Sequence, residues 1–159
     1  MASIPVFSFV AFSGTGKTTL IEKLIAELKL RDLRVAVIKH DAHEFEIDRE
    51  GKDSWRFSQA GADVTVIASS SKAAVMENRP VDPMLLISRI TDVDIIVTEG
   101  FKHGRWPKIA IMRSAVGTSL PIEEDDCFAI VSDFPVNTSK PCFALDDIAG
   151  IASFILSEL

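Results

Sequence analysis

The residues with the clearest chemical potential lie near the start of the chain, in the run AFSGTGKTT at positions 11–19. Gly14 and Gly16 allow the backbone to turn so that its N–H groups point inward around an anion. Lys17 adds a mobile positive charge, and the hydroxyl of Thr18 is a hard oxygen ligand of the kind that Mg²⁺ prefers. This combination of residue types predicts a loop that binds phosphate groups.

The run fits the P-loop pattern G-x-x-x-x-G-K-[ST] except at its first position, where Ala11 replaces glycine. A small residue should be tolerated there. The apolar residues 6–10 predict a strand before the loop, and residues 17–30, with apolar side chains on one helical face, predict a helix after it. The positive end of that helix dipole favours anions. The predicted nucleotide-binding residues of the loop are Ser13, Gly14, Thr15, Gly16, Lys17, Thr18 and Thr19.

Short apolar runs alternate with segments of helical periodicity along the rest of the chain. Further strands are predicted at 34–38, 64–68, 94–98, 108–112 and 128–131. Helices are predicted to begin at the capping residues Asp53 or Ser54, Asp82 and Asp146, and Gly61 is expected to end the first of them. This alternation predicts an α/β fold with a mostly parallel sheet flanked by helices. We expect a single nucleotide-binding domain over residues 1–159, although the strand order cannot be read from the pattern.

Polar residues follow several predicted strands, and ligands of parallel sheets bind beyond the carboxyl ends of strands. Glu99 is the best candidate for an acidic partner of Mg²⁺, together with Thr18. His40 and Asp41 follow the second strand and are expected beside the nucleotide, with Asp41 also considered as a metal contact. Asp133 follows a late strand, where its carboxylate could accept hydrogen bonds from guanine. Asp94 begins its strand, so we expect it to be a surface or capping carboxylate at the opposite edge.

The segment from residue 40 to residue 56 is rich in polar side chains. A zinc site made of His40, His43 and Asp48 is disfavoured, because no cysteine lies nearby to complete it. Lys52 and Arg56 are four residues apart and would share one helix face, where they could bind an anion or simply be solvated. A loop beside the nucleotide, or one that receives a second ligand, is the preferred interpretation of the segment.

Composition narrows the class of protein. The chain has 159 residues, of which 47% are hydrophobic, and a formal net charge of −6, which argues against a general nucleic-acid binder. No apolar run is long enough for a membrane helix, and the first residues lack the basic segment of a secretory signal. Cys127 and Cys142 are too few for a disulfide framework. We therefore expect a cytoplasmic protein with no membrane or nucleic-acid partner.

Some parts of fast nucleotide hydrolases are not recognisable in the sequence. It has no Asn-Lys-x-Asp motif of the common GTPase type, and no catalytic glutamine, arginine finger or arginine-rich lid can be assigned. We therefore expect at most weak hydrolysis by the isolated chain.

Taken together, the segments SGTGKTT, VIKHDAHEFEID, GKDSWRFSQAGAD and TEGFKHGRWPKIAIMR resemble the MobB family of molybdopterin-guanine dinucleotide biosynthesis adapter proteins. The resemblance runs from about Phe7 to Arg113 and continues more weakly to the last predicted helix. The P-loop alone would indicate only a superfamily, whereas the later segments are far more specific.

The resemblance implies a P-loop NTPase fold, a homodimer, and GTP with Mg²⁺ as the ligand. It also implies a role beside MobA, the guanylyltransferase that attaches GMP to molybdopterin. Carried over by position, Gly14 to Thr19 would hold the phosphates and Glu99 would assist Mg²⁺. The adjoining surface would be lined by His40, His43, Lys52 and Arg56.

Two alternatives share the P-loop. In the first, the chain is a small-molecule kinase that uses ATP, with its acceptor bound by residues 40–56. In the second, it is a nucleotide-gated interaction module unrelated to molybdenum. The absence of a recognisable lid and the short chain favour the adapter over the kinase.

Overall fold

The computed structural model describes residues 4–40 and 46–159. Its contacts divide the chain into two compact units. The first comprises the residues up to His40 and those from Asp92 onward, and the second comprises Asp41–Thr91. The expectation of a single domain over the whole chain stays a prediction.

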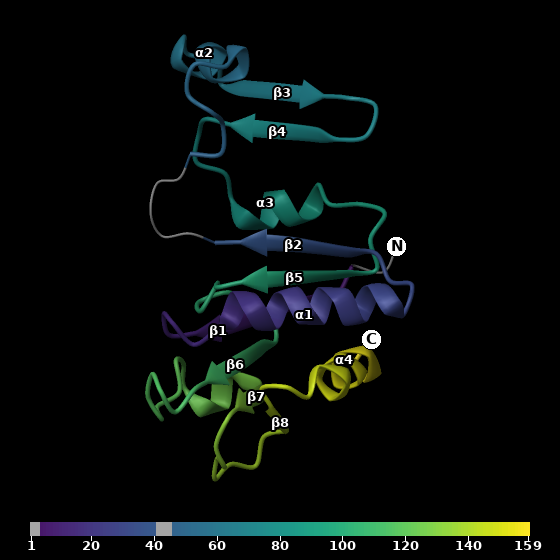
Figure 1. Cartoon of the computed structure of the whole chain (residues 1–159), viewed down its shortest axis with the longest axis vertical. Coiled ribbons are helices and arrows are strands. Elements are labelled where there is room, and N and C mark those ends of the chain that lie inside the picture. The colour runs from purple at the N-terminus through teal and green to yellow at the C-terminus, as the bar shows by residue number, and fades with distance from the viewer. Residues whose placement is uncertain (1–3, 41–45) are drawn as a thin grey trace. The chain divides into compact units, whose positions relative to one another are not determined.

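The first unit is built on a sheet with the strand order β2-β5-β1-β6-β7-β8, in which each described pairing is parallel. Figure 1 shows helix α1 running alongside strand β5, with its axis nearly aligned with that of the strand. The predicted mostly parallel sheet flanked by helices is confirmed. Strand β8 was not predicted. The strands are β1 (Val6–Ala11), β2 (Val35–Lys39), β5 (Ile95–Glu99), β6 (Lys108–Met112), β7 (Cys127–Ser132) and β8 (Cys142–Ala144); the helices are α1 (Lys17–Leu30), the short 3₁₀ turn η1 (Glu124–Asp126) and α4 (Ile148–Ser157).

The two faces of the sheet are covered differently. On one face, Leu24 and Leu28 of α1 and Ile155 of α4 pack in the same apolar cluster as Phe9 of β1. On the other face, loop residues such as Leu120 pack on a second cluster. Successive strand residues point to opposite faces, so a central strand must be apolar on both. All six residues of β1 are buried, which explains its nearly continuous apolar sequence.

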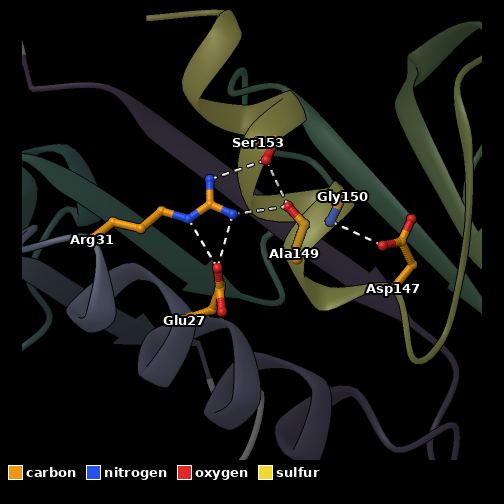
Figure 2. A network of polar contacts seen from close by, with 6 residues as sticks. All are labelled: Glu27, Arg31, Asp147, Ala149, Gly150 and Ser153. Atoms are coloured by element: carbon orange, nitrogen blue, oxygen red, sulfur yellow. Dashed lines mark hydrogen bonds and ion pairs between the residues drawn. The ribbon is translucent and has the colours of Figure 1, made fainter.

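A polar network joins the end of α1 to the start of α4 (Figure 2). Nε of Arg31 donates to the carboxylate of Glu27 at 2.9 Å. The other guanidinium nitrogens donate to the hydroxyl of Ser153 and to the carbonyl of Ala149, each at 3.1 Å. The arginine thus connects two helices that are more than one hundred residues apart in sequence.

The last helix begins one residue later than predicted. Its N-cap is Asp147, not Asp146, and Oδ1 of Asp147 accepts a hydrogen bond from the backbone N–H of Gly150 at 3.0 Å (Figure 2). Two consecutive aspartates are equally good caps by residue type. Only the backbone path decides between them, and here it gives Asp146 a place in the preceding turn.

The second unit contains helix α2 (Asp53–Gln59), the antiparallel hairpin of β3 (Val64–Ala68) and β4 (Ala73–Glu77), and helix α3 (Pro83–Ser88). Asp82 caps α3 as predicted, with its Oδ1 accepting from the N–H of Met84 at 2.8 Å. The predicted cap of α2 is wrong, because Lys52 is its N-cap and Asp53 and Ser54 lie inside the helix. Strand β4 was not predicted.

Within the described ranges, no helix has the length and apolar character needed to cross a bilayer.

Asp94 precedes β5 at the edge of the sheet opposite the P-loop, as expected for a structural carboxylate. Its oxygens accept hydrogen bonds from the guanidinium and the backbone N–H of Arg34, next to β2. These bonds stabilise the charged form and hold the pKa of Asp94 at about 2. Asp94 therefore ties the amino ends of two neighbouring strands and lies away from any ligand at the carboxyl edge.

We expect Arg31→Met to lower the free energy of unfolding by about 1–2 kcal/mol, because it removes charge-assisted hydrogen bonds but keeps the aliphatic stem. Urea unfolding measures the change. The matched control is Lys23→Met, which removes an exposed cation from the same helix and should change stability by less than about 0.5 kcal/mol. Equal effects of the two substitutions would contradict the assigned role of the network.

Candidate functional site

The predicted phosphate loop connects the end of β1 to the start of α1. Gly14 and Gly16 adopt φ of +81° and +85°, a left-handed conformation that costs glycine little and other residues more. Gly16 is the N-cap of α1 and has no side chain with which to cap it. The hydroxyl of Thr15 is buried and donates to the carbonyl of Phe12 at 3.0 Å, which closes the loop on itself. The first N–H groups of the helix are therefore left for an anion.

Three predicted site residues meet beside this loop. Nζ of Lys17 lies 2.9 Å from Oε1 of Glu99, and both side chains are largely buried. Oγ1 of Thr18 lies 3.2 and 3.3 Å from the two carboxylate oxygens of the same glutamate. A residue more than eighty positions away thus brings a carboxylate to the lysine and the hydroxyl of the loop.

The register of the sheet explains this meeting. Strand β5 runs parallel to β1, with Glu99 opposite Phe9, and the N–H of Gly100 donates to the carbonyl of Phe9 at 2.9 Å. One residue earlier, the buried hydroxyls of Ser8 and Thr98 share a hydrogen bond of 2.7 Å. This polar pair comes one residue before Phe9 in β1 and one residue before Glu99 in β5. It therefore links the two strands next to the position of the glutamate.

The donor set fits a hard cation that is partly coordinated by a ligand. Glu99 offers carboxylate oxygens and Thr18 a hydroxyl, and Mg²⁺ commonly binds through one or two such groups plus phosphate oxygens. Within residues 4–40 and 46–159, no cluster of three or more His, Cys, Asp or Glu side chains could hold a metal without such help. A phosphate ligand would have to complete the coordination.

The loop after β5 lies against the end of β2. Gly100 has φ of +98°, and a Cβ there would come within 3.3 Å of the carbonyl oxygen of His40. The ring of His40 stacks on Phe101 at 4.6 Å between centroids, and Phe101 in turn meets the edge of Trp106. The ammonium group of Lys102 lies 5.0 Å from the ring centre of Phe12 in the phosphate loop. His40, which follows β2, therefore packs its ring against the loop that follows β5.

Other predicted residues form polar contacts of their own. Asp133 follows β7, and its two carboxylate oxygens accept hydrogen bonds from the N–H and the hydroxyl of Ser114, at 2.7 and 3.1 Å. These bonds lower its pKa below the usual range. Arg56 belongs to the second unit, where it forms an exposed ion pair with Asp53. Asp41 and His43 lie outside the described residues.

Arg113 was missed by sequence reasoning. It follows β6, the neighbour of β1, and a Cβ placed on Gly16 would lie 3.3 Å from its Nη1. The Arg113 turn also contacts the loop through Val116, which lies 4.0 Å from the position of a Cβ on Gly14. The sequence does show a cation directly after a predicted strand. Only the strand order, which places β6 beside β1, shows that this cation lies near the phosphate loop.

The sheet, the left-handed glycines before α1 and the lysine that opens the helix define a P-loop NTPase fold. Residues 6–133 match the family model described as "Molybdopterin guanine dinucleotide synthesis protein B". The chain belongs to this family, MobB.

Relatives and solved structures agree with this assignment. The chain is 38% identical to the molybdopterin-guanine dinucleotide biosynthesis adapter protein of Escherichia coli, over 96% of this chain and 92% of that protein. It is 37% identical to the Haemophilus influenzae protein of the same name, over 96% and 88%. A crystal structure of molybdopterin-guanine biosynthesis protein B covers 97% of this chain and 99% of its own, with 32% identity and a TM-score of 0.72. That of Bacillus subtilis MobB covers 98% of both chains, with 27% identity and a TM-score of 0.75.

We expect Glu99→Gln to abolish the stimulation of tripolyphosphate binding by Mg²⁺, because an amide is a poor ligand for this cation. Binding without metal should be equal or tighter than in the wild type, since Lys17 loses its competing carboxylate. Titration calorimetry with and without Mg²⁺ measures both effects. Glu22→Gln, on the exposed side of α1, is the matched control. Persistent Mg²⁺ stimulation in Glu99→Gln would exclude this glutamate as the metal ligand.

Proposed function

We propose that this chain binds GTP with Mg²⁺ and serves as an adapter for MobA, the guanylyltransferase that attaches GMP to molybdopterin. In this proposal the chain binds and presents the nucleotide, and the partner enzyme forms the new phosphoanhydride bond. We place the protein in the cytoplasm, in keeping with its two free cysteines.

One observation supports the proposed binding of a nucleotide: Lys17, Thr18 and Glu99 converge beside a glycine loop. An ion pair between a P-loop lysine and an acid from the neighbouring strand satisfies both charges while no ligand is bound. An incoming phosphate offers Lys17 a better partner, with more acceptor oxygens. Glu99 is then available, with Thr18, to Mg²⁺, which neutralises phosphate charge when bound.

The adapter part is supported by the names of the relatives, which describe adapters of molybdopterin-guanine dinucleotide biosynthesis. They do not support the small-molecule kinase considered above. The weak hydrolysis that we expect from the sequence is consistent with this role, because an adapter must deliver its nucleotide intact.

We expect Lys17→Ala to weaken GTP binding by about 100-fold, the cost of losing a charge-assisted contact to phosphate. Circular dichroism should show an unchanged fold. Lys29→Ala, at the far end of the same helix, should bind GTP normally. Unchanged affinity in Lys17→Ala would refute the site.

The same titrations decide between the two nucleotide classes. The wild type should bind GTP more tightly than ATP in the presence of Mg²⁺, and it should raise the rate of GMP transfer when added to the guanylyltransferase. A clear preference for ATP would instead favour the kinase.

We also propose that the protein is a homodimer and that the hairpin of the second unit contributes to the interface. Val66 and Val75 lie directly opposite each other in the hairpin, and they are 62% and 64% exposed. Val64 lies on the same face of β3 and is also exposed. Thr65 points the other way, is buried, and shares a hydrogen bond with Ser58 of α2. An uncovered apolar strand face is a liability in a monomer and a natural contact for a second copy.

We expect Val66→Glu to convert the dimer to monomers, because a charge would be buried in the contact. Analytical ultracentrifugation at micromolar concentration measures the mass. Leu30→Glu, which changes an exposed residue at the end of α1, should leave the dimer intact. A monomeric wild type, or a dimeric Val66→Glu, would contradict this assignment.

A further inference from the structure

The first unit carries an open groove of about 660 Å³ beyond the carboxyl ends of β7 and β8. Its walls come from the segment after β7, with Phe134 and Val136, and from β8 and the following turn, with Phe143 and Leu145. Charged side chains also line it, namely Lys23 of α1, Asp133 and Asp146. Apolar walls with a few polar groups are typical of binding sites for small organic ligands.

The groove and the phosphate loop lie at the same edge of one sheet. Strands β1 and β7 are separated by β6 alone, so they are about 10 Å apart at the usual strand spacing. Along α1, Lys23 follows Lys17 by six residues, or about 9 Å at the helical rise. The ribose and α-phosphate of a nucleotide span a comparable distance. A nucleotide held at the loop can therefore place its base in the groove.

The two carboxylates of the groove differ in their bonding. Both oxygens of Asp133 are engaged by Ser114, so this side chain holds the β6 and β7 loops together. Asp146 precedes the helix cap, and its neighbour Asp147 does the capping. In the part of the chain that the structure describes, the carboxylate of Asp146 has no hydrogen bond or ion pair, and only its backbone carbonyl is used, by Ile148. Among the described residues, Asp146 is thus the groove carboxylate whose two oxygens are not engaged by a protein donor, and a ligand would not have to compete for it.

We propose that the groove binds the guanine base of the nucleotide and that Asp146 selects it by accepting hydrogen bonds from N1–H and the 2-amino group. This inference rests on the proposed binding of GTP at the P-loop. Guanine presents two parallel donors that match the two oxygens of a carboxylate. Adenine presents a lone pair at N1 and no 2-amino group, so the carboxylate would face an acceptor. The selecting carboxylate therefore comes from the turn after β8, whereas sequence reasoning favoured Asp133.

The test compares GTP with xanthosine triphosphate, whose base carries a carbonyl in place of the 2-amino group. An asparagine at position 146 can donate to that carbonyl and accept from N1–H. We expect Asp146→Asn to lose about 10- to 100-fold in GTP affinity and to prefer xanthosine triphosphate over GTP. Binding of inorganic tripolyphosphate, which has no base, should be unchanged. Asp126→Asn makes the same change before β7, at the opposite end of that strand, and should behave as the wild type.

A second readout uses the thiol in the groove wall. Cys142 is exposed and lines the groove, whereas Cys127 is buried. Saturating GTP should protect Cys142 of the wild type from alkylation by iodoacetamide, and saturating tripolyphosphate should not. Partial burial raises the pKa of the Cys142 thiol, so labelling is done at alkaline pH.

The outcomes separate this inference from the proposed function. A wild-type preference for GTP that persists in Asp146→Asn overturns the role of Asp146, and a switch seen instead in Asp133→Asn transfers the role to that residue. Tight tripolyphosphate binding without discrimination among bases, and without protection of Cys142, overturns the groove as a base site and leaves the P-loop site standing. A chain that binds neither tripolyphosphate nor GTP refutes the proposed function and this inference together.

Discussion

The parallel pairing of β1 with its two neighbours is the constraint on which the rest of the structure depends. Because β1, β5 and β6 run in the same direction, their last residues reach one edge of the sheet. Glu99 and Arg113 are thereby placed beside the loop that follows Ala11. A shift of β5 by one residue would turn Glu99 to the other face. The buried hydroxyl pair of Ser8 and Thr98 works against such a shift, because it would lose its partner.

The sequence was most informative where local chemistry is restrictive. Left-handed backbone at two positions requires glycine or a strained residue, so Gly14 and Gly16, followed by Lys17 and Thr18, identify the loop. Strands buried on both faces are nearly continuous apolar runs, which is why β1 and β5 could be predicted with Glu99 at the end of the latter. The parallel sheet followed from these features, whereas the family followed from the resemblance of the more specific segments after the P-loop. The roles of the site residues in ligand binding stay predictions.

What could not be predicted depends on contacts between distant segments. Arg113 becomes a neighbour of Gly16 only through the strand order, which no local pattern encodes. The difference between Asp146 and Asp147 is a difference of backbone path in a turn. Strand β8 has three residues and is too short for alternation to be recognised. Asp133 had the right residue type and position, and only the structure shows that Ser114 engages it.

The ammonium group of Lys17 is already paired with the carboxylate of Glu99 in the structure. Under the proposed function, a phosphate would have to displace this carboxylate from the lysine, and a metal ion would have to displace the lysine from the carboxylate. Each ligand would then remove the competitor of the other, so the two would bind with positive cooperativity. Thermodynamic reciprocity would require the nucleotide to raise the affinity for metal by the same factor that the metal raises the affinity for nucleotide. A site built in this way would disfavour bare nucleotide and favour its metal complex.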